Sequence, residues 1–219
     1  MASFDSFTPE ALRFLSDLKS NNTKDWFAAN KPTYEAHVKD PSKAFADAMT
    51  LSLRDLTGCE HGSKIFRIHR DVRFSKDKTP YNAHLHMSFM PDGQTGQPPM
   101  WFFGLSPEKL SLGCGVFQFE KGALPAFRAA MAGPKGAELI QLTTDLRAAG
   151  VRVREPELKR VPPGFDKDHP QAEALRRKGF AVWIDVADPS FAIQPNLVKR
   201  TTDHFEQIMP VFRLLFQLA

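Results

Sequence analysis

The spacing of apolar residues changes along this chain, and the change divides it into helical and extended stretches. Residues 8–58 carry apolar side chains three or four positions apart, the period of a helix with one buried face. Apolar and polar residues then alternate in four successive segments, at residues 65–74, 84–90, 99–105 and 109–119. Because short or Gly/Pro-rich links join these segments, they predict an antiparallel meander.

Capping residues predict the helix boundaries in the first third. Thr8-Pro9 suits the cap and first position of one helix. Asn22 with Asp25 resembles a capping box that starts a second helix. Asp40-Pro41 starts a third, and Gly58 lies where a C-cap glycine is expected.

Helical spacing returns after the meander, at residues 124–131 and 137–149. A Pro-rich, charged loop precedes a fifth strand at residues 180–186, and Pro210 is expected to kink the last helix. We therefore predict one α+β domain over residues 1–219. It would have a helical N-terminal third, a strand meander at about 64–119, and helices and a fifth strand to the C-terminus. The mainly antiparallel sheet of about five strands would have helices packed on it.

The two cysteines, Cys59 and Cys114, lie far apart and outside any ligand spacing, which argues against a disulfide framework or a zinc site. No signal-peptide pattern and no run of about 18 apolar residues occurs, so we expect a cytoplasmic protein with no membrane partner. Most of the 19 Phe rings should be core, because Phe has no polar group. The sequence identifies no cofactor and no oligomeric state.

The net charge of +4 comes from one segment. Between Lys64 and His86 lie six of the 29 cationic residues and two of the 25 acidic ones, so the remainder of the chain is balanced. A patch focused in this way attracts an anionic partner and steers its approach. It does not indicate a protein coated with charge for nucleic acid.

The strand expected at residues 65–74 would have a polar face made of Arg67, His69, Asp71 and Arg73. If it pairs with the next strand, cross-strand side chains about 5 Å apart would bring that face opposite His84, His86 and Ser88. The link between the strands would hold Lys76, Lys78 and Tyr81 at the rim. Such a group of side chains is typical of a binding or catalytic pocket.

The residue types suggest roles in that pocket. Arg67, Arg73 and Lys78 would bind a phosphate or carboxylate group. The catalytic candidates are His69 or His84 as acid or base, with Asp71 to orient the imidazole. Tyr81 would donate a hydrogen bond, and His86 is a further ligand-binding candidate. A solvated strand face would show the same alternation of polar residues, so a merely structural origin stays open.

Arg70 interrupts the expected apolar face between Ile68 and Val72, and a guanidinium there needs a partner. Asp77 or a helix acid would make Arg70 structural, whereas a bound anion would make it a ligand contact. Both interpretations satisfy the cost of burial.

Metal binding by His84 and His86 is disfavoured, because six nearby cations repel a divalent ion. We therefore predict no metal site. Gly113-x-Gly115 lacks the rest of a dinucleotide fingerprint and instead indicates a bulge or a close approach to the strand. Cys114 between them suits a small buried hydrophobe better than a nucleophile.

The stretch "RIHRDVRFSKDKTPY" resembles the signature of a bacterial family known as domain of unknown function 2461. The pattern is Arg-x-x-Arg-Asp-x-Arg-Phe, then Asp/Asn-Lys, then Tyr, and it is matched by Arg67, Arg70, Asp71, Arg73, Phe74, Asp77, Lys78 and Tyr81. "NNTKDWFAANKPTYE" and "LKRVPPGFDKDHPQAEALRRKGF" are also similar to the family, and so is "LGCGVFQF" apart from Cys114. The resemblance covers nearly the whole chain. It implies a single-domain bacterial protein of this length and no particular activity.

Three functions are consistent with these features. The first is a pocket that recognises an anionic small molecule, with phosphoester chemistry the best fit if the protein is an enzyme. The second is a nucleic-acid-binding module, less favoured because no exposed aromatic platform or basic helix is expected. The third is a scaffold domain whose charged motif is an ion-pair network.

Overall fold

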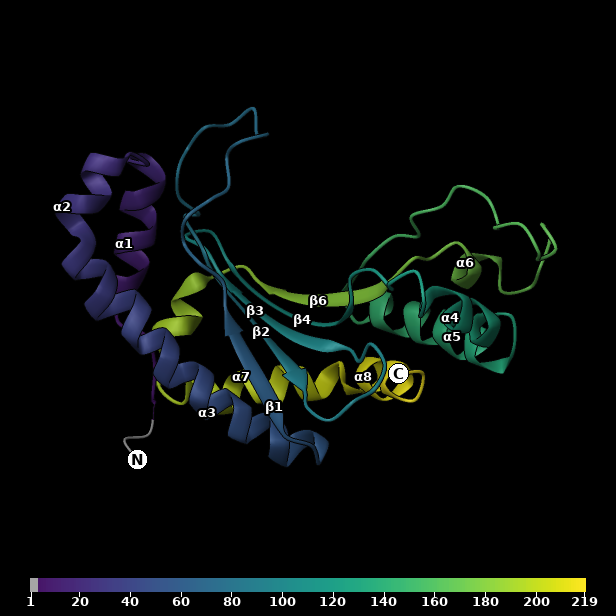
Figure 1. Ribbon diagram of the computed structural model, residues 1–219. Coiled ribbons are helices and arrows are strands. Elements are labelled where there is room, and N and C mark those ends of the chain that lie inside the picture. Colours follow the sequence, from purple (N-terminus) through teal and green to yellow (C-terminus); the bar gives the residue numbers. More distant parts are fainter. Residues whose placement is uncertain (1–3) are drawn as a thin grey trace. The chain divides into compact units, whose positions relative to one another are not determined.

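The computed structural model describes residues 4–219 and has an α+β fold built on one six-stranded antiparallel sheet (Figure 1). The strand order is β1-β2-β3-β4-β6-β5. The strands are β1 (His61–Ile65), β2 (Leu85–Pro91), β3 (Met100–Leu105), β4 (Leu110–Val116), β5 (Arg152–Val153) and β6 (Phe180–Val186). The predicted fold class is confirmed. The sheet has one strand more than expected because β5 has only two residues, too few to show a period.

The helices begin with α1 (Pro9–Ser20) and α2 (Lys24–Tyr34), followed by the π-helical turn η1 (Glu35–Lys39) and α3 (Asp40–Thr57). The others are α4 (Leu124–Met131), α5 (Pro134–Ala148), α6 (Ala172–Leu175), the 3₁₀ turn η2 (Pro189–Ile193), α7 (Leu197–Gln207) and α8 (Met209–Phe216). Pro210 produces a full break: α7 ends before it, and it lies in the first turn of α8.

Two helix boundaries differ from the sequence prediction. Thr23, rather than Asn22, caps α2, with its hydroxyl accepting from the Trp26 N–H at 3.2 Å. The second and third helices are also continuous, because the backbone stays helical through η1. Single π-helical turns of this kind often occur at functional sites.

The main correction concerns residues 66–74, predicted as the first strand. β1 lies earlier, at His61–Ile65, and most of the expected strand belongs to the loop between β1 and β2. Phe66 and Phe74 alternate onto the same expected apolar face as Ile68 and Val72, yet they are 47% and 95% exposed. Aspartate side chains explain the loop: Asp71 accepts from the Arg73 N–H, and Asp77 accepts from the Thr79 N–H. Such Asx turns compete with an extended ladder.

Contacts within the chain cluster into two compact units. Of the described residues, the first contains 4–89, Phe102–Leu112 and Asp185–Asp203. In this unit α3 packs along β1, and Phe45 lies 4.6 Å from Phe103 between ring centroids. Eleven of the 19 Phe residues in the chain are buried, as expected for core rings.

The second unit comprises Met90–Trp101, Gly113–Ile184 and His204–Ala219. Its core includes Trp101 stacked on Phe212 at 5.1 Å. Gly115 has φ 141°, and a Cβ there would overlap the Phe180 carbonyl, so this glycine permits the close approach of β6 that the Gly-x-Gly pattern indicated. Cys114 is fully buried, and its burial raises the pKa of the thiol. Among residues 4–219 no helix combines the length and apolarity needed to cross a membrane.

Candidate functional site

The loop between β1 and β2, residues 66–84, carries the predicted site and is called the basic loop below. Its two ends run antiparallel to each other. The Phe66 N–H donates to His86 O at 2.9 Å, the Asn82 N–H to Ile68 O at 2.7 Å, and the Arg70 N–H to Pro80 O at 2.8 Å. An isolated bridge also pairs His69 with Tyr81. The sequence predicted an antiparallel pairing of residues 65–74 with 84–90. The structure instead pairs residues 66–70 with 80–86, mostly outside regular strands.

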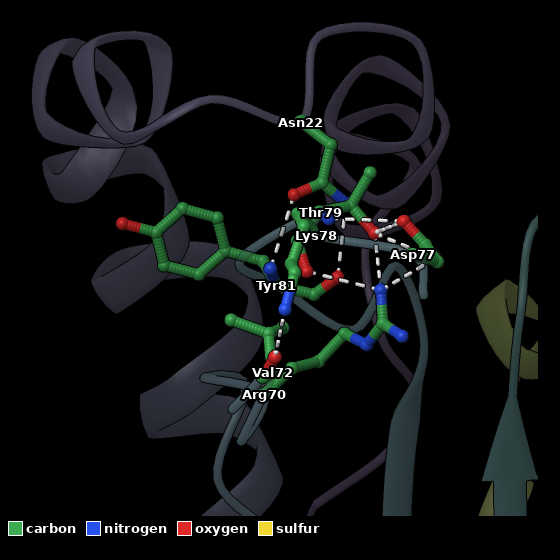
Figure 2. Close-up of polar contacts among 7 residues, drawn as sticks. All are labelled: Asn22, Arg70, Val72, Asp77, Lys78, Thr79 and Tyr81. Atoms are coloured by element: carbon green, nitrogen blue, oxygen red, sulfur yellow. Dashed lines mark hydrogen bonds and ion pairs between the residues drawn. The ribbon is translucent and has the colours of Figure 1, made fainter. Parts of the chain in front are cut away.

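Asn22 anchors the basic loop to the first helices. Its Nδ2 donates to Tyr81 O at 2.9 Å, and its Oδ1 accepts from the Tyr81 N–H at 3.0 Å (Figure 2). One side-chain amide thus pairs both backbone groups of a residue 59 positions away, as a neighbouring strand would. The Tyr81 side chain is buried and stacks on Phe27 with ring centroids 4.2 Å apart.

Arg70 joins two parts of the basic loop through its guanidinium. Its Nη1 donates to Asp77 Oδ2 at 2.6 Å, to Thr79 O at 3.0 Å and to the Thr79 hydroxyl (Figure 2). The Thr79 N–H, the Arg70 guanidinium and the Thr79 hydroxyl lower the pKa of Asp77 to about 2. The structural partner that the sequence suggested for Arg70 is therefore present. In residues 4–219, however, Arg70 Nε and Nη2 make no hydrogen bond, so the other edge of the guanidinium is unused.

Two predicted anion-binding cations serve the loop itself. Lys78 Nζ donates to Val72 O at 3.0 Å (Figure 2), and Arg73 pairs with Asp71 through contacts at 3.0 and 2.7 Å. This pairing lowers the pKa of Asp71. The Asp71 oxygens thus accept from an arginine, whereas the sequence interpretation had Asp71 orienting a histidine. The Arg73–Asp71 pair is largely exposed, so it contributes little to stability.

Beside the loop lies a cavity of about 410 Å³, called here the arginine-histidine pocket. Its lining residues are Phe66, Arg67, His69, Arg70, Asp71, Asn82, His84 and His86. Six of these eight are predicted site residues. Arg73, Lys78 and Tyr81 are not among them, and Figure 2 shows the Tyr81 ring pointing away from the Arg70–Asp77 contacts.

Arg67 supplies a guanidinium to this pocket from an exposed side chain. In the part of the chain that the structure describes, its guanidinium makes neither a hydrogen bond nor an ion pair. Its charge nevertheless contributes to lowering the pKa of Asp71, so it lies near that carboxylate. A guanidinium exposed in a pocket offers a fork of donors that fits phosphate or carboxylate oxygens.

His84 and His86 stack on each other with ring centroids 4.0 Å apart. Surrounding protein atoms, and then the charge of Arg70, lower the pKa of His84. Loss of hydration, and then proximity to His84, lowers the pKa of His86 to about 4, although part of its side chain stays exposed. Both rings are therefore neutral at pH 7, and each can donate one hydrogen bond and accept another.

Gly104 makes room for this histidine stack. A Cβ on Gly104 in β3 would lie 3.0 Å from His86 Cδ2, closer than ordinary packing allows. His69 is exposed, and its ring meets the edge of the Tyr81 ring at 5.1 Å. The pocket thus combines two guanidinium edges with three imidazoles, on a framework held by Asn22.

Several contributors were not predicted as site residues: Asn22, Phe66, Asn82 and Gly104. Asn22 belongs to "NNTKDWFAANKPTYE", one of the stretches that resembles the family, and this resemblance was the one sign in the sequence that Asn22 contributes to the site. No group of three or more His, Cys, Asp or Glu suited to holding a metal ion occurs within residues 4–219.

Comparisons with known proteins agree with the resemblance. The model of the family described as "Conserved hypothetical protein (DUF2461)" matches residues 10–213. A search of curated proteins gave no match.

Proposed function

The chain belongs to the DUF2461 family, whose description names no activity, and from the site we propose that the protein binds a small molecule bearing a phosphate or carboxylate group. The binding site would be the arginine-histidine pocket. A cytoplasmic location, predicted from the sequence, is part of this proposal.

One observation carries the proposal: the pocket contains donor groups that the protein itself does not use. Arg67 has no partner in the described chain, and Arg70 is held by Nη1 alone, which leaves its Nε–Nη2 edge unbonded. By contrast, Arg73 and Lys78 are occupied by Asp71 and by Val72 O. An anion in the pocket would supply acceptors for the unused donors.

If the bound molecule reacts, phosphoester or phosphoryl chemistry fits the residues best, because positioned cations do most of the work in such reactions. A neutral imidazole is required for a general base. His84 meets that condition at pH 7 because its pKa is lowered, and His69 lines the same pocket. Asp71 is not needed in this scheme.

Isothermal titration of inorganic phosphate, pyrophosphate, sugar phosphates and carboxylates tests the proposal. Arg67→Ala should weaken binding of the best ligand at least tenfold, because a charge-assisted hydrogen bond contributes about 1.5–3 kcal/mol. Lys76→Ala is the matched control, since it removes one positive charge from the basic loop at an exposed residue that does not line the pocket and, within residues 4–219, pairs with no carboxylate. Equal losses in both variants would indicate general attraction to the loop, and no binding by the native protein would refute the proposal.

A nucleic-acid-binding role is the second candidate, and the structure adds an observation in its favour. Phe66 and Phe74 are exposed, with Lys64 Nζ 5.0 Å from the first ring centroid and Arg73 Cζ 5.9 Å from the second. Exposed rings beside cations suit base stacking. Affinity for a single-stranded oligonucleotide should then fall steeply with salt and with Phe74→Ala.

The scaffold alternative draws on the Arg70–Asp77–Thr79 contacts, which hold the loop without any ligand. It differs from the leading proposal in one measurement. A scaffold would show no thermal shift with any small anion, whereas a ligand at about 100 times its Kd should add roughly 2.7 kcal/mol of stability.

A further inference from the structure

A second cavity of about 410 Å³ shares a wall with the arginine-histidine pocket. It is called here the apolar pocket. Phe66, Arg67 and His69 line both cavities, and all three are exposed, so the edge of the common wall is open to solvent. A molecule lying across this edge would contact both cavities at once.

The two cavities differ in chemistry. The arginine-histidine pocket is lined by charged and polar side chains apart from Phe66. The apolar pocket is lined by Phe27, Tyr34, Ile65, Ile68 and Leu85, to which the polar Ser42 also contributes. Ser42 is satisfied within the helix, because its hydroxyl donates to Val38 O at 2.5 Å. Apart from the Tyr34 hydroxyl, which makes no hydrogen bond within residues 4–219, these side chains therefore offer apolar surface.

The lining of the apolar pocket also includes cationic side chains. Lys31, Lys39 and Lys43 belong to its lining, with Glu35 as their one acidic neighbour there. Lys39 contacts Glu35 at 3.4 Å and Lys43 contacts Asp40 at 2.8 Å, whereas Lys31 has no ion-pair partner in residues 4–219. Glu35 and Lys39 are the two ends of the π-helical turn η1, so this irregular turn faces the cavity.

We infer that the ligand is an amphipathic anion, with its phosphate or carboxylate head in the arginine-histidine pocket and an apolar body in the apolar pocket. This inference rests on the proposed function and adds the class of molecule. Arg67, which belongs to both linings, would bind the head at the junction. An apolar body without a charged head would leave the unused donors of Arg67 and Arg70 without an acceptor.

A homologous series of n-alkyl phosphates, from methyl to octyl and below the concentration of micelle formation, tests the inference by titration calorimetry. Affinity should rise by up to about fourfold per methylene until the apolar pocket is filled, and the matching n-alkanols should bind far more weakly. Vesicles of phosphatidylcholine containing phosphatidic acid form a second arm. If the protein sediments with these vesicles and Arg67→Ala does not, the ligand source is a membrane lipid. If the native protein stays in the supernatant, the source is a free amphiphile.

Ile65→Thr is the informative variant, because Thr keeps the β-branched shape suited to the end of β1 but presents a hydroxyl to the apolar pocket. This substitution should weaken the binding of octyl phosphate about fivefold and leave the affinity for inorganic phosphate unchanged. Ile184→Thr in β6 is the matched control, because Ile184 is half-buried and lines neither pocket. It should alter the affinity for neither phosphate.

The outcomes separate the two proposals. If inorganic, methyl and octyl phosphate all bind equally, the anion site stands and the apolar body is refuted. If alkanols bind as tightly as alkyl phosphates, or if no phosphate binds, the anion site and the inference built on it both fail.

Discussion

The side chain of Asn22 pairs with both backbone polar groups of Tyr81, at 2.9 and 3.0 Å. This contact joins the turn before α2 to the end of the basic loop, and thereby places one wall of the arginine-histidine pocket. The Tyr81 ring strengthens the same junction by stacking on Phe27 of α2. The pocket therefore depends on a residue that does not line it.

Replacing Asn22 with alanine should destabilise the protein by about 2 kcal/mol, because two hydrogen bonds are lost and buried backbone groups of Tyr81 lose their partners. Urea denaturation measures this change. Asn21→Ala is the control: Asn21 makes one exposed side-chain bond, to Asp17 O, and its loss should change stability by less than about 0.5 kcal/mol. Equal effects of the two substitutions would contradict the anchoring role of Asn22.

Arg70 and Asp71 are adjacent, yet their substitutions should differ. Arg70→Met removes the bonds to Asp77 and Thr79 and should cost about 1–2 kcal/mol, because Arg70 is three-quarters buried. Asp71→Ala breaks contacts with the guanidinium and the backbone N–H of Arg73, both exposed, and should lower the urea midpoint much less. A large loss from Asp71→Ala would instead support a scaffold network that includes Asp71.

The fold was largely predictable because its helices and most of its strands have regular apolar periods and capping residues. Thr8-Pro9, Gly58 and the alternation at β6 each mark an observed boundary or strand. The alternation at residues 66–74 misled because periodicity does not distinguish buried rings from exposed ones. Phe74 is almost fully exposed, and the Asp71 and Asp77 side chains turn the backbone there.

The site was predictable to the extent that it is local in sequence. Six pocket residues fall within one stretch of 20 positions, between Arg67 and His86, so their types alone indicated a cluster. Asn22 and Gly104 were missed because their roles arise from contacts with Tyr81 and His86, which are distant in the chain. Sequence reasoning also could not show that Lys78 and Arg73 are used by the loop itself.

Stability should fall as the pH decreases from about 6.5 toward 4. The pKa values of His84 and His86 are lower in the folded protein, about 4 for His86, so below pH 6.5 the unfolded chain binds protons that the folded pocket excludes. Because His86 is partly exposed, we expect a loss of about 1 kcal/mol. Urea midpoints at pH 7.5, 6 and 4.5 measure it.

His86→Gln should flatten that pH dependence, whereas Asp77→Asn should leave it intact. The folded-state pKa of Asp77 is about 2, below the ordinary 3.8, so the stability that Asp77 contributes is present above pH 3.8 and is lost between 3.8 and 2. If the stability of His86→Gln depends on pH as that of the native protein does, groups other than His86 control stability between pH 4 and 6.5.

Gly104→Ala should change the chemistry of the pocket with little effect on stability. The added methyl group would lie 3.0 Å from His86 Cδ2 and 3.1 Å from Nε2, so the imidazole must move by a few tenths of an ångström, and the exposed side of His86 lets it move toward solvent. The pKa of His86 should then rise from about 4 toward 6.5, which an NMR titration of the ring protons measures. Stability should change by less than about 1 kcal/mol, since alanine also lowers the entropy of the unfolded chain.

Gly122→Ala is the control, because a Cβ there meets no atom within 4 Å and His86 should keep its pKa of about 4. A pKa of about 4 that persists in Gly104→Ala would mean that the close packing of β3 is not what keeps His86 neutral.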